Sequence, residues 1–336
     1  MIDTIYIEKR VLEHTRTLSI LARFPDARRV NIERYSDVFN ATNQNFREQK
    51  QHPALILAEK SGKRTLPTPP GYHIGGNRNF YFSHMLNCIY DCRYCFLQGM
   101  YRSANYVVFV NTNDFFADIK SISDESSEPS WFFSGYDCDS LALDPITGFT
   151  DECLDFFART PKAHLELRTK STQIRPLLAR KPLPNVVVAY SLSPSAIAAA
   201  EEHQAPTLKR RLESLGKLQQ AGWKIGLRFD PLLYADNFDE IYGQFFKEVF
   251  AAIDASAVHS ASLGVFRLPK GFHKKLVQLY PKSTLLASNT EQREDGLVTY
   301  PINDEKRMMS FCKEALLEHL EAVSYTHLTL PTIYSV

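Results

Sequence analysis

Two rhythms of apolar and polar residues alternate from about residue 80 to residue 270. Short and largely apolar runs, typical of strands buried on both faces, predict strands at 106–110, 131–135, 186–192 and 262–266. More mixed runs predict further strands at 164–170 and 224–231. Between the strands, helical spacing predicts helices at 150–159, 208–221 and 239–253. Strands that alternate with helices favour a parallel sheet with crossover connections, so the sequence predicts an α/β protein.

The same patterns divide the chain into four segments. Residues 1–80 precede the alternating series and predict an N-terminal extension, with a proline-rich turn region at 66–71. The series itself occupies 81–270 and is followed by a C-terminal segment at 271–322 that ends in a predicted helix. Residues 323–336 do not continue that helical pattern, and we interpret them as a non-native tail that is excluded from the fold.

Composition and charge narrow the class of protein. With 336 residues, of which 44% are hydrophobic, the chain can bury a sizeable core. Its 39 Lys and Arg residues nearly balance 38 Asp and Glu residues, so only a local basic patch could attract nucleic acid. The sequence shows neither an apolar run of transmembrane length nor a basic-then-apolar leader. We therefore expect a cytoplasmic protein with no membrane partner.

Three cysteines carry the strongest chemical signal in the chain. Cys88, Cys92 and Cys95 follow a CxxxCxxC spacing, so three thiols fall within eight residues. A [4Fe–4S] cluster held by three thiolates keeps one iron open, and that iron can bind a substrate or a second cofactor. Tyr94 and Phe96 flank the last cysteine and can shield its sulfur from water.

A structural zinc site is the main alternative interpretation of these cysteines. His84 precedes Cys88 by four residues, so it could complete a Cys3His site. In that case the chain would be a zinc-stabilised nucleic-acid-binding protein without catalysis. A disulfide framework is disfavoured because the sequence shows neither a secretory leader nor paired cysteine spacings.

The cysteine motif, followed by an aromatic residue, resembles the cluster motif of the radical S-adenosylmethionine superfamily. Further segments resemble the spore photoproduct lyase family, a DNA repair photolyase-like group, at 5–13, 53–58, 92–98 and 139–148. The resemblance implies a partial (β/α)6 TIM-like barrel with an N-terminal α/β extension. It also implies a carbon–carbon lyase that uses a [4Fe–4S] cluster and S-adenosyl-L-methionine to make a 5′-deoxyadenosyl radical, which abstracts hydrogen from its substrate.

The resemblance also implies partners and cofactor-binding residues. The substrate would be a thymine-dimer lesion in DNA, and flavodoxin or ferredoxin would supply the electron. Lys170 ends a predicted strand and matches a lysine that contacts the cofactor carboxylate, while Ser191 and Ser193 match a region that contacts the cofactor. Arg228, Asp230 and Arg267 also lie at predicted strand ends, where they could belong either to the site or to structural ion pairs.

Two departures from the family pattern concern the hydrogen-atom donor. Spore photoproduct lyases use a fourth cysteine, and an ungapped alignment places Tyr136 at its position and Cys138 two residues later. Either residue is therefore a candidate donor. Tyr94 matches an aromatic donor position in the cluster loop, whereas Phe96 replaces a second tyrosine and has no O–H to give. These changes leave open a radical S-adenosylmethionine enzyme that acts on a different substrate.

Overall fold

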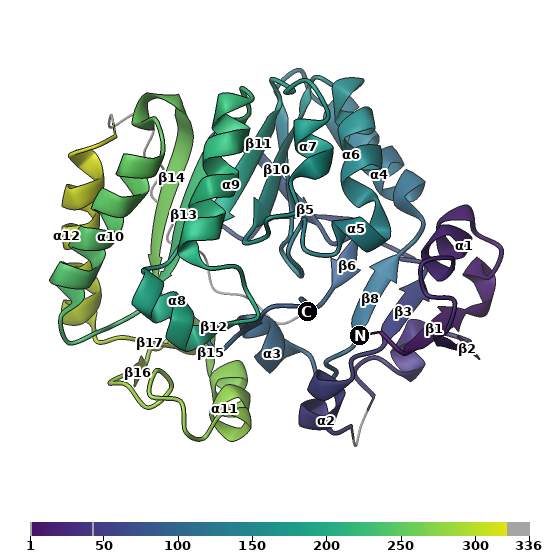
Figure 1. Cartoon of the computed structure of the whole chain (residues 1–336), viewed down its shortest axis with the longest axis horizontal. Helices are drawn as coiled ribbons and strands as arrows, with labels where there is room; N and C mark the ends of the chain where they lie inside the picture. The colour runs from purple at the N-terminus through teal and green to yellow at the C-terminus, as the bar shows by residue number, and fades with distance from the viewer. Residues whose placement is uncertain (1, 42–43, 321–336) are drawn as a thin grey trace.

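The computed structural model describes residues 2–41 and 44–320, and within them the chain forms two main sheets flanked by helices (Figure 1). The larger sheet has seven strands in the order β14-β13-β11-β10-β9-β5-β4, and the smaller has five in the order β2-β1-β3-β8-β6. The predicted non-native tail at 323–336 lies outside the described residues. Within the described ranges, no helix is both long and apolar enough to cross a bilayer.

Six neighbouring strands of the seven-stranded sheet run parallel, and only β4 is antiparallel to its neighbour β5. The residues of β9, β10, β11, β13 and β14 are mostly buried, as expected for strands covered on both faces, whereas β5 at the end of the parallel series is largely half-buried. The strands are β4 (Thr65–Pro67), β5 (Arg78–Phe82), β9 (Ser130–Ser134), β10 (Ala163–Thr169), β11 (Val186–Ser191), β13 (Lys224–Leu232) and β14 (Val258–Val265).

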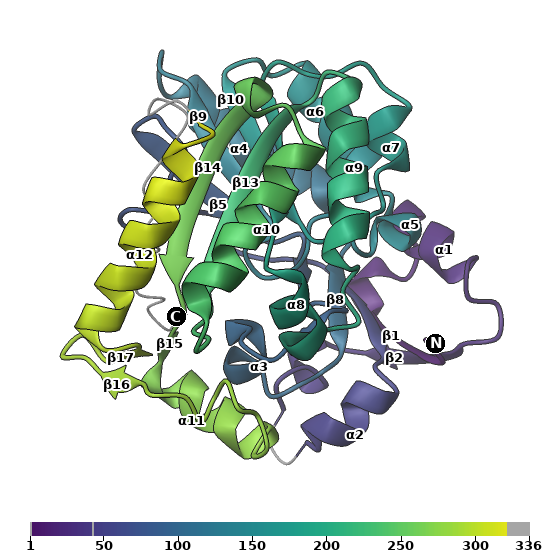
Figure 2. The ribbon, with the colours of Figure 1, turned by 60° about the vertical axis from the view of Figure 1, so that its left-hand side comes forward.

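Amphipathic helices cover the outer face of this sheet (Figures 1 and 2). In α9 the buried leucines recur at helical spacing, Thr207 caps the first turn, and Gly222 follows the last turn with a φ of 91°. The covering helices are α4 (Thr112–Asp124), α6 (Phe149–Ala158), α7 (Arg175–Leu178), α9 (Leu208–Gln220), α10 (Phe238–Ala252) and α12 (Ile302–Leu317).

The five-stranded sheet differs from the sequence-based prediction. The strand predicted at 106–110 as part of the alternating series is β8, and it pairs with β3 in the N-terminal sheet. Conversely, β5 begins at Arg78, inside the predicted extension, and joins the larger sheet. A continuous apolar run predicts a strand that is buried on both faces, but it does not tell which sheet the strand joins. The smaller sheet holds β1 (Thr4–Glu8), β2 (Arg28–Ile32), β3 (Leu55–Ala58), β6 (Met85–Leu86) and β8 (Tyr106–Phe109), with α1 (Thr15–Leu21) and α2 (Phe46–Gln51) beside it.

Short elements gather at the carboxyl ends of the larger sheet's strands (Figure 2). They form two small antiparallel ribbons, β7 with β12 and β15-β17-β16. The remaining bounds are β7 (Asp91–Cys92), β12 (Glu202–His203), β15 (Arg267–Pro269), β16 (Glu291–Gln292), β17 (Leu297–Thr299), α3 (Phe96–Met100), α5 (Asp144–Thr147), α8 (Ser195–Glu201) and α11 (Lys270–Leu279). Three 3₁₀ turns complete the set: η1 (Lys9–Val11), η2 (Tyr35–Asp37) and η3 (Ala255–Ala257).

A buried ion pair joins three strands of the larger sheet. Arg228 on β13 donates to both carboxylate oxygens of Glu166 on β10, at 3.2 and 2.7 Å, and to the carbonyl of Ser260 on β14 at 3.2 Å. Both charged side chains are essentially inaccessible to solvent. The strand-end position of Arg228 was compatible with a role either in the site or in a structural ion pair. In the structure its guanidinium is buried in a structural ion pair with Glu166.

Candidate active site

A cavity of about 210 Å³ lies at the carboxyl ends of the larger sheet's strands, and the side chains of Cys88, Cys92 and Cys95 line it. Including its mouth, the hollow holds about 1250 Å³. Its other walls come from the strand ends of β9, β10, β11, β13 and β14 and from β15. Pockets for small molecules occupy this place in barrel proteins, because the loops after the strands converge there.

The cysteine loop is fixed at three points. Asn87 adopts a left-handed φ of 73° and its side-chain amide donates to the carbonyls of Ser103 and Asn105 at 2.9 and 3.1 Å. Cys92 lies in β7, which pairs with Glu202 of β12. The amide of Cys95 donates to the carbonyl of Cys92 at 3.1 Å, and Cys95 then caps α3. The loop therefore presents its thiols from a held backbone.

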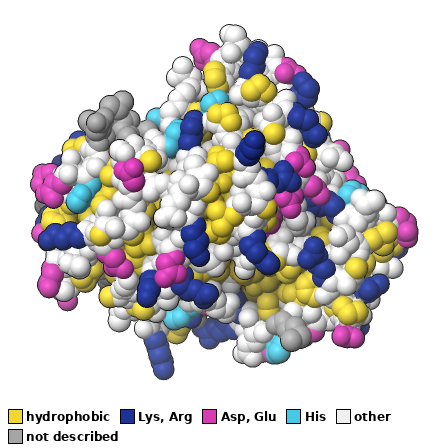
Figure 3. Space-filling view, turned by 45° about the horizontal axis from the view of Figure 1, so that its top comes forward, with side chains coloured by type: hydrophobic (Ala, Val, Ile, Leu, Met, Phe, Trp, Pro, Cys, Tyr) yellow, Lys and Arg dark blue, Asp and Glu magenta, His cyan; other side chains and the backbone are white. Residues whose placement is uncertain are grey.

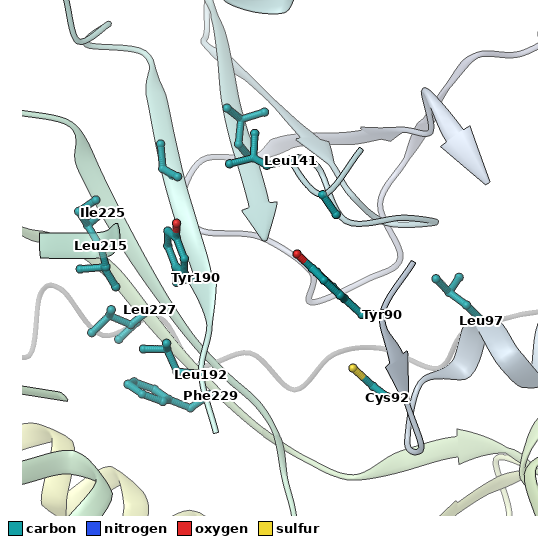
Figure 4. Packing of buried hydrophobic residues seen from close by; sticks show 14 of the residues in the cluster. Tyr90, Cys92, Leu97, Leu141, Tyr190, Leu192, Leu215, Ile225, Leu227 and Phe229 are labelled. Atoms are coloured by element: carbon teal, nitrogen blue, oxygen red, sulfur yellow. The ribbon is translucent and has the colours of Figure 1, made fainter. Parts of the chain in front are cut away.

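Burial keeps the three thiols protonated unless a cation is present. It raises the pKa of Cys88 to about 12, and it also raises the pKa values of Cys92 and Cys95. Lys170 opposes this effect at all three sulfurs, and the amide of Tyr90 donates to the sulfur of Cys88 at 3.4 Å. Figure 4 shows Tyr90 and Cys92 projecting from the loop toward the strands of the sheet. Iron would supply the positive charge that thiolates need here, so the residues fit a thiolate-bound cluster.

His84 does not turn toward this loop, contrary to what a Cys3His site needs. Its ring stacks on Phe149 with centroids 3.7 Å apart, and its Nδ1 lies 4.0 Å from the sulfur of Cys138. Among residues 2–41 and 44–320, no three His, Cys, Asp or Glu side chains converge closely enough to hold one metal ion. A cluster binds each thiolate through a different iron, so its ligands need not converge on one point.

Lys170 lies opposite the cysteines, just after β10. Its ammonium is 5.6 Å from the ring centroid of Tyr94, and its backbone amide donates to Asp139 at 2.6 Å. Asp139 also accepts from the amides of Leu141 and Ala142 and from the hydroxyl of Thr169. Asp139 thus ties the loop after β9 to the end of β10. Sequence reasoning did not assign Asp139 a role, because its partner segment lies 31 residues away.

The two predicted serines separate in the structure. Ser191 lines the cavity and accepts from Nε of Arg168 at 3.4 Å. Ser193 is buried and donates to Glu202 at 2.9 Å, so it belongs to the network behind the cysteine loop. The structure therefore brings Ser191, but not Ser193, to the wall of the cavity with Lys170.

A second charged group lines the cavity away from the cysteines. Arg168 and Arg267 each lie 3.8 Å from the carboxylate of Asp230, and Arg168 donates to the hydroxyl of Tyr72 at 3.3 Å. Asp230 and Arg267 were candidates for the site, and both line the cavity. Sequence reasoning missed Arg168, although the period-two alternation of β10 places it on the same face as Lys170, two residues further along the chain.

Tyr136 and Cys138 both line the cavity. Tyr136 stacks on Tyr81 with centroids 4.3 Å apart and lies 6.0 Å from the ring of Phe96. Gly135 precedes it with a φ of 87°, and a Cβ at this position would approach the hydroxyl of Ser140 to 2.6 Å. The tight turn at Gly135 therefore requires glycine, and it directs the 136–138 segment along the cavity wall.

The hydroxyl of Tyr94 is held in a buried network although its ring lines the cavity. It donates to Glu202, which also accepts from Arg211 on α9 and from Ser193. Burial raises the pKa of Glu202, but Lys170 and Arg211 outweigh that effect and its net pKa is lowered. Tyr94 thus connects the cysteine loop to a carboxylate that is charged at neutral pH.

Comparisons with known proteins agree with this arrangement. A spore photoproduct lyase from Geobacillus sp. (strain Y412MC61) is 25% identical over 202 residues, which are 59% of each chain. One from Bacillus subtilis (strain 168) is 21% identical over 301 residues, which are 86% of this chain and 85% of the relative.

Solved structures share the fold. A spore photoproduct lyase mutant with bound AdoMet and dinucleoside spore photoproduct matches with a TM-score of 0.83 at 18% identity, covering 97% of this chain and 98% of that one. Another, complexed with dinucleoside spore photoproduct, has a TM-score of 0.82 at 18% identity, with the same coverage. The family model for spore photoproduct lyase matches residues 80–325, which include the cysteine loop and most of the larger sheet. The chain belongs to the spore photoproduct lyase family of radical S-adenosylmethionine proteins, and it is an enzyme of the lyase class.

Proposed function

We propose that this chain is a radical S-adenosylmethionine lyase that repairs spore photoproduct, a thymine-dimer lesion in DNA. One observation carries the proposal: the three cysteines of the motif, Lys170 and Ser191 line a single cavity at the strand ends. The parallel strands β5, β9, β10, β11, β13 and β14 support a partial (β/α)6 barrel as the scaffold.

Cys88, Cys92 and Cys95 would hold a [4Fe–4S] cluster, and the fourth iron would be open to S-adenosyl-L-methionine. When bound and reduced, the two cofactors supply a 5′-deoxyadenosyl radical that abstracts hydrogen. The protein's part is to keep the thiols dry and to position the reactants. Tyr90, Tyr94 and Leu97 contribute apolar surface to the cavity around the cysteines.

Lys170 and Ser191 are suited to hold the second cofactor. A lysine ammonium is a compact cation that pairs with a carboxylate, and a serine hydroxyl can donate or accept at a ribose or carboxylate. Asp139 fixes the backbone of Lys170, so the point from which the side chain extends is already ordered when the ammonium binds. A family structure with bound AdoMet supports S-adenosyl-L-methionine as that cofactor.

The lesion would enter through the mouth of the cavity after leaving the base stack, at a cost of a few kcal/mol. Family structures with bound dinucleoside spore photoproduct support such a substrate. Acidic and basic side chains are interspersed on the face shown in Figure 3, in keeping with the small net charge of +1. Recognition is therefore expected to depend on the cavity rather than on a broad basic surface. All six cysteines are free, which supports a reducing, cytoplasmic location.

Two residues compete for the role of hydrogen-atom donor to the product. Tyr136 stands in the aromatic stack on the cavity wall, and Cys138 lies two residues further with its sulfur near His84. Both are within the cavity lining, so both stay candidates. Tyr94 is a third, but its hydroxyl is engaged by Glu202.

The test begins with anaerobic reconstitution of the full chain with iron and sulfide. We expect about four irons per chain and reductive cleavage of S-adenosylmethionine. Cys95→Ala should lose both, whereas Cys312→Ala, which removes a buried thiol on α12, should keep both. Stoichiometric zinc without cleavage activity would contradict the proposal.

Repair of a spore photoproduct oligonucleotide then tests the substrate. An ungapped alignment places Tyr136 at the position of the family's donor cysteine, and Phe96 replaces a tyrosine. Both features favour a second candidate function, the same radical chemistry on a different substrate. Cleavage of S-adenosylmethionine without lesion repair would select that second function. If repair occurs, Tyr136→Phe and Cys138→Ala should differ, because only the donor's loss should divert the product radical to side products.

A further inference from the structure

A second hollow of about 570 Å³ lies on the other side of α3 from the cavity. Its walls are α2, α3 and α11; α2 and α11 lie at the lower edge of Figure 2, and α3 lies above them. Phe96 and Leu97 of α3 line the cavity, whereas Gln98 of α3 and Tyr101, the residue after the helix, line this groove. The short helix after Cys95 is therefore a wall between the two, and it is held tightly because Gly99 packs directly on Phe272 of α11.

The floor of the groove is bonded to the cysteine loop. Gln98 donates to the backbone carbonyl of Cys92 at 2.6 Å and accepts from the hydroxyl of Tyr280. Tyr280 also lies 3.2 Å from Asp91, the residue before Cys92. A molecule bound in the groove would thus be separated from Cys92 by the side chain of Gln98.

The groove is basic. Arg47, Arg102 and Lys275 line it, and none of its lining residues in the described chain is acidic. Lys50 and Arg93 lie behind it and share Asp91, at 3.0 and 3.3 Å. Glu48 is an exposed acid on α2 outside the lining, so the lining itself keeps its positive charge. The whole chain has a net charge of only +1, which makes this local excess distinctive.

We propose that this groove is the docking surface for a small acidic electron-transfer protein, which carries a flavin or an iron–sulfur centre. The inference rests on the proposed function, because the partner would pass one electron to the cluster and be oxidised by one electron itself. Complementary charge would steer its approach. Since α3 separates the groove from the cavity, such a partner would not compete with a substrate that enters the cavity.

The experiment compares two reductants in three proteins. The reductants are reduced flavodoxin, an acidic probe protein, and photoreduced deazaflavin, a small molecule that needs no docking surface. The proteins are the reconstituted wild type, Arg102→Glu/Lys275→Gln, and the control Lys209→Glu/Lys217→Gln on exposed positions of α9. Both double variants change the charge by the same amount. The backbone bond of Arg102 to Asn40 survives, and glutamine can still donate toward the carbonyl of Gly99 that Lys275 binds.

We expect flavodoxin to reduce the groove variant roughly tenfold more slowly or worse, with a weaker dependence on salt, while the control matches wild type. Deazaflavin should reduce all three equally. Equal flavodoxin rates, or equal slowing with both reductants, would overturn the docking proposal. So would a groove variant that loses binding to a lesion oligonucleotide and keeps its flavodoxin rate. Wild type without a reducible cluster would instead defeat the proposed function.

Discussion

The two fully buried arginine–glutamate pairs have the same chemistry but different surroundings. Within the part of the chain that the structure describes, Arg228 and Glu166 satisfy each other, and Arg228 otherwise donates to groups of the sheet strands β13 and β14. Glu202 is instead shared by Arg211, Tyr94 and Ser193, so its bonds extend to the cysteine loop. We call the Arg228–Glu166 pair closed, because its bonds stay within the sheet, and the Arg211–Glu202 pair branched, because its bonds also reach the cysteine loop. A closed pair stabilises the scaffold, whereas a branched pair connects the scaffold to the site.

Arg228→Met should give the largest loss of stability. It leaves the carboxylate of Glu166 buried without its partner, and we expect the free energy of unfolding to fall by about 3–5 kcal/mol. Urea denaturation measures this. Arg228→Met/Glu166→Leu should recover most of the loss, because a well-packed apolar pair can replace a buried ion pair. If the double variant is as unstable as Arg228→Met, the two side chains do more than satisfy each other, and the pair is not closed.

Glu202→Gln should cost somewhat less stability, about 3 kcal/mol, because glutamine still accepts hydrogen bonds while Arg211 loses its counter-charge. Unlike Arg228→Met, it should also speed the loss of iron from the reconstituted protein to a chelator, since β7 pairs with β12. Chelation followed by absorbance compares the two variants at equal fractions folded. Equal rates of iron release from the two variants would show that neither pair is specifically coupled to the cysteine loop.

Tyr94→Phe tests the bond between Tyr94 and Glu202 separately from the Arg211–Glu202 pair. It removes one hydrogen bond to a charged group, worth about 1.5–2 kcal/mol, and keeps the ring that lines the cavity. The variant should keep its cluster but cleave S-adenosylmethionine with altered efficiency if the hydroxyl positions the loop. The matched control is Tyr300→Phe, which removes a buried hydroxyl that accepts from the amide of Tyr234, just after β13. An identical response of both variants would argue against a positioning role.

The smallest effect comes from a group outside both pairs. Burial, reinforced by Arg16, lowers the pKa of His84 to about 3 from its ordinary value of 6.5. The folded state therefore keeps this ring neutral while the unfolded state takes up a proton below pH 6.5. Stability should be complete above that pH and fall by about 1.4 kcal/mol between pH 7.5 and 5.5. Urea titrations should show this loss diminished in His84→Asn, and an unchanged pH dependence would refute it.

Local patterns revealed much of this molecule, and long-range contacts were hidden from them. The cysteine loop and Lys170 could be found because a short spacing and a strand end identify them. The strand at 106–110 was recognised, but its sheet was not, because both sheets bury such runs completely. Glu202 escaped notice because it meets Tyr94 across 108 residues. Ser193 was matched to the cofactor region by the family resemblance, and its bond to that same glutamate could not be read from the sequence.

The pairing of β6 with β8 limits how far this enzyme can be shortened. Met85 and Leu86, just before the cysteine loop, pair with β8, and β8 pairs with β3 from the first 58 residues. A fragment that starts near residue 80, where the family match begins, would keep every cysteine but expose β8 as a bare, apolar edge. The smallest functional unit is therefore larger than the part of the chain that the family model matches, and a chain cut at residue 80 should aggregate.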